Sequence, residues 1–519
     1  MNIFIEKIKF SNLRTYYKII KFKIKKILSL IFNVNYLWNN KFQNFSHPNN
    51  KILIFAPSMN LDKTSYLNVG LRLLIEKAKK LNIETQIIQC VSGLDICHLG
   101  GSPFTDKVKM PCESCCVVNR SLYKDLNIIK FESISKFSEL NKLSFDQLKK
   151  FKYKDINIGQ LSITSIAWIL RTPEVNSGHI NYLRKSISSG IKLVDFLENQ
   201  DLKFFSGVLV FNGLTMPEAI MYQWCKINNL NVATFESGWS IKNEYALEIN
   251  YKPSPQHFFD FENRKLTESE NKALLNYMDV KKAKFESFKI DDNRKIISIF
   301  GNVSWDTTQI VSSKLFESMF NWLDSLIPII QKHPEYLFIF RAHPGENRNL
   351  KETWYGLENW FELNQDKLNN NSICFSANNK VNSYEIIKES ELVLVYNSTI
   401  GIESAILGRR VLAAALTHYS DIGFVDSFKN KFQYLKELEQ TLVGSKFETE
   451  VINTQQAKSY YYQLLNDVAY NFGAINLELP FNEHTILRDF ELQSEKVDDL
   501  SNAINSFLYK KPLEKKFNL

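Results

Sequence analysis

Polar residues that could contact a phosphate follow an apolar run at 336–340. There the chain reads Phe338-Ile-Phe-Arg-Ala-His-Pro-Gly-Glu346, so a predicted strand ends in Arg341, His343 and Pro344. In an open α/β sheet, the carboxyl ends of the strands face the ligand crevice. Proline fixes the adjacent backbone, which would hold His343 in place to donate a hydrogen bond to a phosphate or ribose oxygen. The alternative is a histidine in an ordinary turn.

A second predicted strand turns directly into a helix. Its apolar run ends at Tyr396, and Asn397-Ser-Thr-Ile-Gly-Ile-Glu403 follows. Ser398 and Thr399 would cap the helix, which leaves free backbone amides and a positive dipole end that can bind phosphate. Glu403 lies four residues after Thr399, on the same helix face, where it could accept hydrogen bonds from a ribose or a base. The alternative is a plain cap followed by a solvent-facing glutamate.

A third strand, at 295–300, runs into a polar, glycine-containing loop at 301–308. Loops of this kind bring backbone amides and hydroxyls to a phosphate. The candidates for contact with the phosphate of a donor substrate are Asn302, Ser304 and Asp306.

Two glutamates in the first half of the chain are candidate general bases. Glu236 directly follows the apolar run 231–235, and Glu218 comes soon after the run 207–211. A transferase that inverts configuration needs a carboxylate or a histidine to take the proton of the attacking hydroxyl. We expect Glu236 to be the base, with Glu218 second. The alternative is that either glutamate only holds a loop by accepting backbone hydrogen bonds.

Strands and helices alternate in two successive sets, which positions these residues. The first set begins at 51 and the second at 295, with a charged stretch at 252–292 that suits a connection between domains. Two doubly wound Rossmann-like sheets facing across a cleft make the α/β architecture called GT-B. The expected divisions are a basic amphipathic segment at 1–45, an acceptor domain at 46–285, a donor domain at 286–425 and a helical region packing on or across the domains at 426–519.

The positive charge is concentrated at the start of the chain. The net charge is +8, and residues 1–41, with nine lysines and arginines against one glutamate, account for all of it. A formally neutral remainder argues against nucleic acid as a partner. Apolar residues such as Ile19 and Phe22 are mixed with the lysines, as in a helix that lies on an anionic membrane surface. We therefore expect a cytoplasmic protein, peripheral at the inner face of the membrane; the alternative is a capping helix with a solvated basic face.

The seven cysteines indicate reduced, cytoplasmic thiols, because their number is odd and no secretion signal precedes them. The cluster Cys112-Glu-Ser-Cys115-Cys116, with Cys97 and His98 upstream, could supply four metal ligands. Zinc sites, however, usually combine two well-separated pairs, and the adjacent side chains of Cys97 and His98 diverge on most backbones. Free thiols in a loop are the expectation, and we assign no metal.

Together, the Arg-x-His-Pro strand end and the turn Tyr-Asn-Ser-Thr-Ile-Gly-Ile-Glu-Ser-Ala resemble the capsule polysaccharide biosynthesis family. That family includes the 3-deoxy-manno-octulosonic acid transferases of bacterial capsules. The resemblance covers about 295–425, and the turns around Glu218 and Glu236 extend it less specifically to 205–425. It implies the GT-B fold, transfer without a bound metal or cofactor, and His343, Ser398, Thr399 and Glu403 as donor-site residues.

The expected function is therefore transfer of a sugar from a nucleotide-sugar donor to a bacterial surface polysaccharide, in a capsule or a lipopolysaccharide. A CMP-sugar is favoured over a UDP-sugar, and the acceptor would be a glycan or glycolipid. Two alternatives stay open: a nucleotide-sugar 2-epimerase of the same fold, and a non-catalytic glycan-binding subunit of a capsule assembly complex.

Overall fold

The computed structural model describes most residues between 51 and 471, and Ile504. Within 51–471 the ranges outside the description are 60–65, 101–107, 109, 124–125, 133–138, 239, 242–245, 251–260, 283–291, 314, 349–350, 449–453 and 467–468. The predicted basic segment at 1–45, and with it the predicted membrane contact, thus lies outside the described residues. Residues 472–503 and 505–519 also lie outside them. In the part that is described, no helix is long and apolar enough to cross a membrane.

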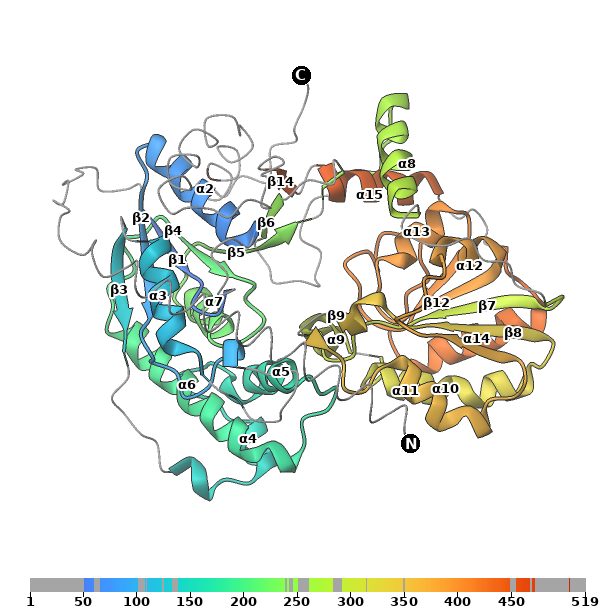
Figure 1. The fold of residues 1–519 in the computed structure, drawn as a ribbon, viewed down its shortest axis with the longest axis horizontal. Coiled ribbons are helices and arrows are strands. Elements are labelled where there is room, and N and C mark those ends of the chain that lie inside the picture. Colours follow the sequence, from blue (N-terminus) through green and yellow to red (C-terminus); the bar gives the residue numbers. More distant parts are fainter. Residues whose placement is uncertain are drawn as a thin grey trace, which may run out of the picture.

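The first domain is built on a seven-stranded sheet with helices on both faces (Figure 1). Alternate residues of a strand point to opposite faces, so Ile52 and Ile54 pack toward α2, whereas Leu53 and Phe55 pack into the core that holds α5, α6 and α7. The strands are β1 (Lys51–Phe55), β2 (Glu84–Cys90), β3 (Asn127–Phe131), β4 (Gly207–Phe211), β5 (Val232–Gly238), β6 (Ala246–Asn250) and β14 (Ala469–Asn471). The helices are α2 (Tyr66–Lys80), α3 (Cys112–Leu122), α4 (Phe145–Lys149), α5 (Ile158–Leu170), α6 (Ile180–Glu198) and α7 (Glu218–Ile227).

The second domain is built on five parallel strands, again covered on both faces. Ile297 and Ile299 pack toward α10, α11 and α14, whereas Ile296 and Phe300 pack toward α8, α12, α13 and α15. The strands are β7 (Lys295–Phe300), β8 (Tyr336–Arg341), β11 (Ser372–Phe375), β12 (Ser390–Val395) and β13 (Arg410–Ala413). The helices are α8 (Glu268–Lys282), α9 (Thr307–Ser312), α10 (Met319–Lys332), α11 (Leu357–Asn364), α12 (Ser383–Glu389), α13 (Ile400–Ile406), α14 (Lys431–Gly444) and α15 (Thr454–Asn466).

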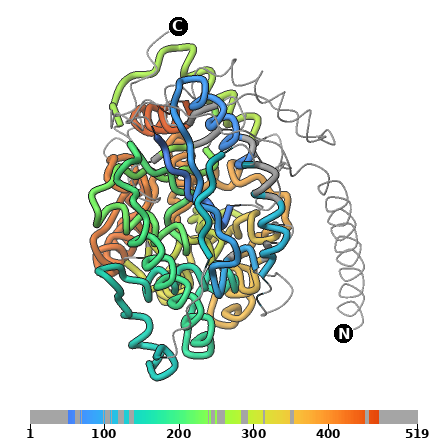
Figure 2. Tube along the Cα trace, turned by 90° about the vertical axis from the view of Figure 1, so that its left-hand side faces the viewer, coloured from blue at the N-terminus to red at the C-terminus, as the bar shows by residue number. Residues whose placement is uncertain are grey.

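The two sheets share one topology. The first runs β14-β6-β5-β4-β1-β2-β3 and the second β11-β8-β7-β12-β13. When the five parallel strands of each sheet are numbered along the chain, both orders read 3-2-1-4-5, which is the doubly wound arrangement. In the view turned by 90° (Figure 2), the blue-to-green first domain stands in front of the yellow-to-orange second domain. The predicted fold class, two Rossmann-like α/β domains as in GT-B, is confirmed.

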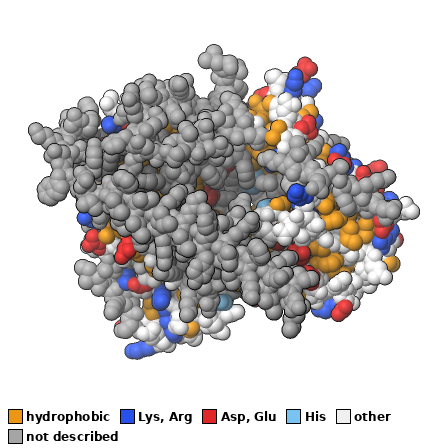
Figure 3. Space-filling view, in the orientation of Figure 1, with side chains coloured by type: hydrophobic (Ala, Val, Ile, Leu, Met, Phe, Trp, Pro, Cys, Tyr) orange, Lys and Arg blue, Asp and Glu red, His pale blue; other side chains and the backbone are white. Residues whose placement is uncertain are grey.

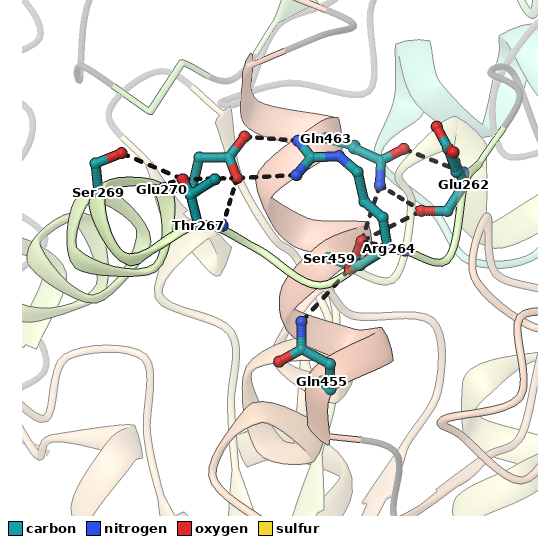
Figure 4. Close-up of polar contacts among 8 residues, drawn as sticks. All are labelled: Glu262, Arg264, Thr267, Ser269, Glu270, Gln455, Ser459 and Gln463. Carbon is teal, nitrogen blue, oxygen red and sulfur yellow. Dashed lines mark hydrogen bonds and ion pairs between the residues drawn. The ribbon is translucent and has the colours of Figure 1, made fainter.

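Helix α15 fastens the segment that leads into the second domain (Figure 4). The side-chain amide of Gln463 donates to the Glu262 carbonyl at 2.7 Å and accepts from the Glu262 amide at 3.1 Å. One turn earlier on the same helix face, the Ser459 hydroxyl also donates to the Glu262 carbonyl. Arg264 then makes two hydrogen bonds, of 2.8 and 2.6 Å, to the carboxylate of Glu270 in the first turn of α8.

The chain returns to the first domain directly after α15, because β14 pairs with β6 in antiparallel fashion. Strand β6 is the last strand before the first passage into the second domain, and β14 is the first after the return. The two passages that the described residues make between the domains therefore leave the first sheet from neighbouring strands at one edge.

Candidate functional site

The two domains touch where helix α5 of the first meets helix α9 of the second (Figure 1). The ring of Trp168 packs edge-on against Trp305, with ring centroids 6.0 Å apart and planes at 83°. The guanidinium carbon of Arg171 lies 5.7 Å from the Trp305 ring centroid. Trp305 is fixed from its own domain by a 3.1 Å hydrogen bond from its indole nitrogen to the Thr353 hydroxyl. Trp305, a residue of the predicted donor loop, thus connects that loop of the second domain to α5 of the first.

Glu236, near the carboxyl end of β5, faces the second domain. Its carboxylate accepts a 2.6 Å hydrogen bond from the side-chain amide of Asn212, which follows the neighbouring strand β4. Burial, and to a smaller extent the negative charge of Asp306 in the second domain, raise the pKa of Glu236 to about 7, although the Asn212 hydrogen bond lowers it. Two residues predicted for opposite halves of the site are therefore electrostatic neighbours across the domain boundary.

Asp306 also has a structural task, because it is the N-cap of α9. Its carboxylate accepts from the Thr308 amide at 2.9 Å and from the Thr308 hydroxyl at 2.7 Å. Asn302, in the same loop, donates from its side-chain amide to the side-chain oxygen of Asn397 at 2.8 Å, and the side-chain amide of Gln309 donates to the same oxygen. The structure thereby joins two of the predicted donor segments, the loop after β7 and the turn after β12.

His343 is held in one orientation. Its Nδ1 accepts a 2.9 Å hydrogen bond from the Gly345 amide, so the neutral ring carries its proton on Nε2. Gly345 has no room for a side chain, because a Cβ there would lie 2.8 Å from His343 Nδ1 and 3.3 Å from Val303. Pro344 opens the short 3-10 turn between them and is exposed. His343 therefore stands beside the Asn302 loop as a preoriented N–H donor.

Glu346, which the sequence analysis did not single out, closes the same motif. Its carboxylate is buried and accepts a 3.2 Å hydrogen bond from the Leu357 amide at the start of α11. Burial raises its pKa to about 7. The signal available in the sequence was its position at the end of Arg-Ala-His-Pro-Gly-Glu. Its partner identifies it as a support for the loops behind His343.

Two residues predicted to contact the donor, Arg341 and Glu403, form hydrogen bonds with other groups of the protein. Arg341 is 1% exposed, and its guanidinium donates to the carbonyls of Ser376 and Asn379. Glu403 is 3% exposed and accepts from the Lys281 ammonium at 2.9 Å and the Tyr461 hydroxyl at 2.7 Å. This arrangement corrects the expectation that both side chains face the cleft, because each one ties its strand or helix to neighbouring elements of the second domain.

The turn into α13 also differs in part from the prediction. Ser398 precedes the N-cap position, and its hydroxyl accepts from the Ile400 amide at 3.4 Å. Thr399 occupies the N-cap position, but its side chain makes no capping hydrogen bond, which corrects the expectation for that residue.

Ser304, predicted to contact the donor, is buried and donates to the Tyr355 carbonyl at 2.9 Å. Its hydroxyl therefore holds the loop that precedes α11.

Glu218 lies deeper in the first domain than Glu236. It opens α7 with 0% exposure, and one carboxylate oxygen accepts from the Ser58 amide at 2.7 Å and the Ser58 hydroxyl at 2.5 Å. Burial raises its pKa to about 7. Glu236 is partly exposed and Glu218 is not, so Glu236 is the better placed of the two to meet an acceptor hydroxyl.

The cysteine cluster is helical, which corrects the prediction of a loop: Cys112, Cys115 and Cys116 lie in the first turns of α3. With Cys90 and Cys97 they line a cavity of about 20 Å³. Burial raises the pKa of Cys90 and Cys115 to about 12, which favours thiols over thiolates at neutral pH. Among the described residues, no group of three or more His, Cys, Asp or Glu side chains is arranged to hold a metal ion.

Figure 3 shows one face of the molecule, with a depression between its two halves. Acidic and histidine side chains, in red and pale blue, are visible in the depression between the two halves of the molecule. The carboxyl ends of β5 and β7 supply Glu236 and the Asp306 loop to this boundary. The chemistry available there is a carboxyl group that titrates near neutrality, a fixed imidazole donor and a network of side-chain amides.

No protein family matches the sequence, and none of the curated proteins is recognisably similar to it. Among solved structures, the chain is similar to KpsC, a beta Kdo 2,4 transferase of Thermosulfurimonas dismutans, at 12% identity and a TM-score of 0.33, over 50% of this chain and 80% of that one. It is also similar to a Rickettsia africae glycosyltransferase, at 11% identity and a TM-score of 0.28, over 90% of this chain and 100% of that one. A third similar structure is the UDP-GlcNAc 2-epimerase of Neisseria meningitidis bound to UDP-GlcNAc, at 14% identity and a TM-score of 0.24, over 85% of this chain and 99% of that one. Because these TM-scores are low, the fold rests on the strand order of the two sheets and the site on its own geometry.

Proposed function

We propose that this chain is a glycosyltransferase that moves a sugar from a nucleotide-sugar donor to an acceptor hydroxyl, with Glu236 as the general base. The observation that carries the proposal is the position of Glu236 at the domain boundary, opposite Asp306, with a pKa of about 7. A base is most effective when its pKa lies near the working pH. With a pKa near neutrality, Glu236 can both accept a proton and release it again close to pH 7.

In the proposed reaction, Glu236 takes the proton of the acceptor hydroxyl as that oxygen attacks the anomeric carbon of the donor. The bond from that carbon to the phosphate oxygen breaks, and the nucleotide leaves with the bonding electrons. Attack opposite the leaving group inverts the configuration. Asn212 supports the carboxylate form through its 2.6 Å hydrogen bond, and Glu218 stays the second candidate for the base.

The second domain would bind the nucleotide. Because Nδ1 of His343 accepts from the Gly345 amide, the ring would contact the nucleotide through its Nε2 side. The side-chain amides of Asn302 and Asn397, which a 2.8 Å hydrogen bond joins, could bond to a ribose or a phosphate oxygen. We propose that such groups stabilise the leaving group without a bound metal or cofactor, and that a CMP-sugar is preferred over a UDP-sugar.

The proposed acceptor is a growing bacterial surface glycan or glycolipid, held near the inner face of the cytoplasmic membrane. The support for the membrane part is the run of nine basic residues against one acidic residue in 1–41. Removing residues 1–41 should release the protein from anionic vesicles in a flotation assay, while nucleotide binding persists. Unchanged flotation would refute the membrane contact alone.

A calorimetric screen of CMP, UDP, GDP and their sugar conjugates tests the central proposal. We expect selective binding of one nucleotide, lost in His343→Ala. A matched control is His179→Ala, because His179 Nδ1 accepts a backbone amide, that of Asn176, at 3.1 Å in the first domain. Binding of none of these nucleotides by the wild type would refute the proposal. Conversion of the sugar nucleotide without any acceptor would identify the epimerase instead.

A further inference from the structure

The segment 149–154 concentrates positive charge in an otherwise neutral part of the chain. It reads Lys149-Lys-Phe-Lys-Tyr-Lys154, with four lysines in six residues and no acid. Residues 42–519 are formally neutral as a whole, so this run is a local feature. All four lysines are exposed. Figure 3 shows lysine and arginine side chains, in blue, at the lower end of the first domain, where Figure 1 places α4.

Three of these lysines are available to a ligand. In the described part of the chain, no ion pair or hydrogen bond joins the side chains of Lys149, Lys150 or Lys152 to another residue. Lys154, in contrast, is paired with Asp195 at 3.0 Å. We call Lys149, Lys150 and Lys152 the lysine surface.

The backbone that carries the lysine surface is held in place on both sides. Tyr153 and Ile156 exchange two backbone hydrogen bonds of 3.0 Å, around a turn whose two central residues have positive φ. The Gly159 amide donates to the Phe151 carbonyl at 2.9 Å. A side chain at Gly159 would clash with the Leu148 carbonyl, so α5 begins in direct contact with the end of α4. The three ammonium groups are therefore presented from a fixed position.

The aromatic residues between the lysines face inward. Phe151 and Tyr153 pack against the core that holds α5, α6 and α7, and the Tyr153 hydroxyl donates to Asp195 at 2.7 Å. No large hydrophobic residue between 139 and 157, all of which are described, is exposed. A helix that lies on a membrane inserts apolar side chains, and a surface for single-stranded nucleic acid offers aromatic rings for stacking. The lysine surface offers charge alone, which argues against both partners.

The remaining polyanion that the proposed function supplies is the acceptor glycan. A lysine ammonium is a hydrated point charge on a flexible stem, without the planar fork of arginine. It therefore suits carboxylates that recur at variable spacing along a flexible chain. Helix α5 begins at Ile158, just after the lysine surface, and near its other end Trp168 meets Trp305 at the domain boundary. Its 13 residues separate the two places by about 20 Å, a span that a chain of several sugars can cover.

We propose that the lysine surface binds an acidic glycan, the acceptor chain whose end is extended at the domain boundary. The inference rests on the proposed function and adds the class of the acceptor, a glycan that carries carboxylates. The surface holds the part of the chain that has already been made, so a longer acceptor binds more tightly than a short one.

The test measures dissociation constants by calorimetry on the full chain, with two hexasaccharides as probes. The galacturonic acid hexamer carries a carboxylate on every sugar, and maltohexaose is neutral. Wild type should bind the acidic hexamer more tightly than maltohexaose, and added salt should weaken that binding. The triple variant Lys149→Gln, Lys150→Gln, Lys152→Gln should weaken it by about 10- to 100-fold, at about two- to fivefold for each exposed charge.

The matched control is the triple variant Lys130→Gln, Lys203→Gln, Lys226→Gln. These three lysines are also exposed and lie in the first domain, but they are dispersed over β3, the segment before β4, and α7. The control removes the same net charge, and binding of the acidic hexamer should stay within about twofold of wild type. Thermal unfolding of both variants checks that each one is folded.

The outcomes separate the inference from the proposed function. Equal weakening in both triple variants would show an effect of net charge only and overturn the inference. Equal binding of the two hexasaccharides by wild type, or none, would also overturn it. Loss of binding to phosphatidylglycerol vesicles in the lysine-surface variant, with binding of the acidic hexamer unchanged, would assign the surface to a membrane instead. Absence of nucleotide binding in wild type would refute the proposed function, and the glycan measurements do not depend on it.

Discussion

Removing the side chain of Asn212 should make Glu236 a weaker acid. The Asn212 amide donates to the Glu236 carboxylate at 2.6 Å, and Asn212 has φ 55°. Asn212→Gly suits that backbone conformation and removes the donor to Glu236 together with the oxygen that accepts from the Leu214 amide. A hydrogen bond to a charged group contributes about 1.5 to 3 kcal/mol, and 1.36 kcal/mol corresponds to one pKa unit. The pKa of Glu236, about 7 in the wild type, should therefore rise by about 1 to 2.

The assay is the pH dependence of kcat/KM for sugar transfer. Glu236 acts as a base only when ionised, so activity rises with pH through its pKa, and the acidic limb should move from about pH 7 to about pH 8 or 9 in Asn212→Gly. Asn229→Gly is the control, because Asn229 is exposed, has φ 56° and lies in the first domain. An acidic limb that stays near pH 7, or moves to lower pH, would refute Glu236 as the base supported by Asn212.

Three further predictions concern stability and binding. Burial raises the pKa of Glu218 from 4.5 to about 7, so its contribution to stability is complete below pH 4.5 and is lost as pH rises through 7. Glu218→Gln should remove about 3 kcal/mol of the pH dependence of the free energy of unfolding. Urea unfolding at pH 5 and pH 8 measures that dependence, and the same dependence in the variant as in the wild type would contradict the prediction. Gly345→Ala should displace His343 by its close Cβ contact and weaken nucleotide binding about tenfold or more, the loss of one hydrogen bond, which calorimetry would detect. Gln463→Ala should lower the free energy of unfolding by about 1 to 3 kcal/mol, because two hydrogen bonds to the Glu262 backbone are lost; an unchanged denaturation midpoint would count against it.

The fold could be predicted because buried parallel strands read as continuous apolar runs. Lys295–Phe300 and Tyr336–Arg341 are of this kind, and each is followed by a polar loop and a helix. Strand β13 was not predicted, because its four residues Arg410–Ala413 follow α13 after a short turn and carry too little pattern of their own. The apolar strands therefore specify the two sheets, and the short edge strand becomes evident only from its pairing with β12.

The site could be predicted only as far as strand order reaches. Residues that end neighbouring parallel strands, such as Asn212 and Glu236, must lie close together, and they do. The partners of Glu403 lie more than fifty residues away, at Lys281 and Tyr461, and no local pattern indicates them. The position of Arg171 depends likewise on how the two domains pack, which periodicity within one element does not report.

The neighbouring passages at β6 and β14 place a hinge between the two domains. Both connections that the described residues make between the domains leave the first sheet at one edge. That edge is therefore the hinge, and α15 stiffens it by holding Glu262. Trp168 of α5 contacts Trp305 through their rings, and α5 lies away from β6 and β14 in Figure 1. A small rotation about the hinge would therefore cause a larger displacement at these two indoles. Their fluorescence should report how far apart the two domains are.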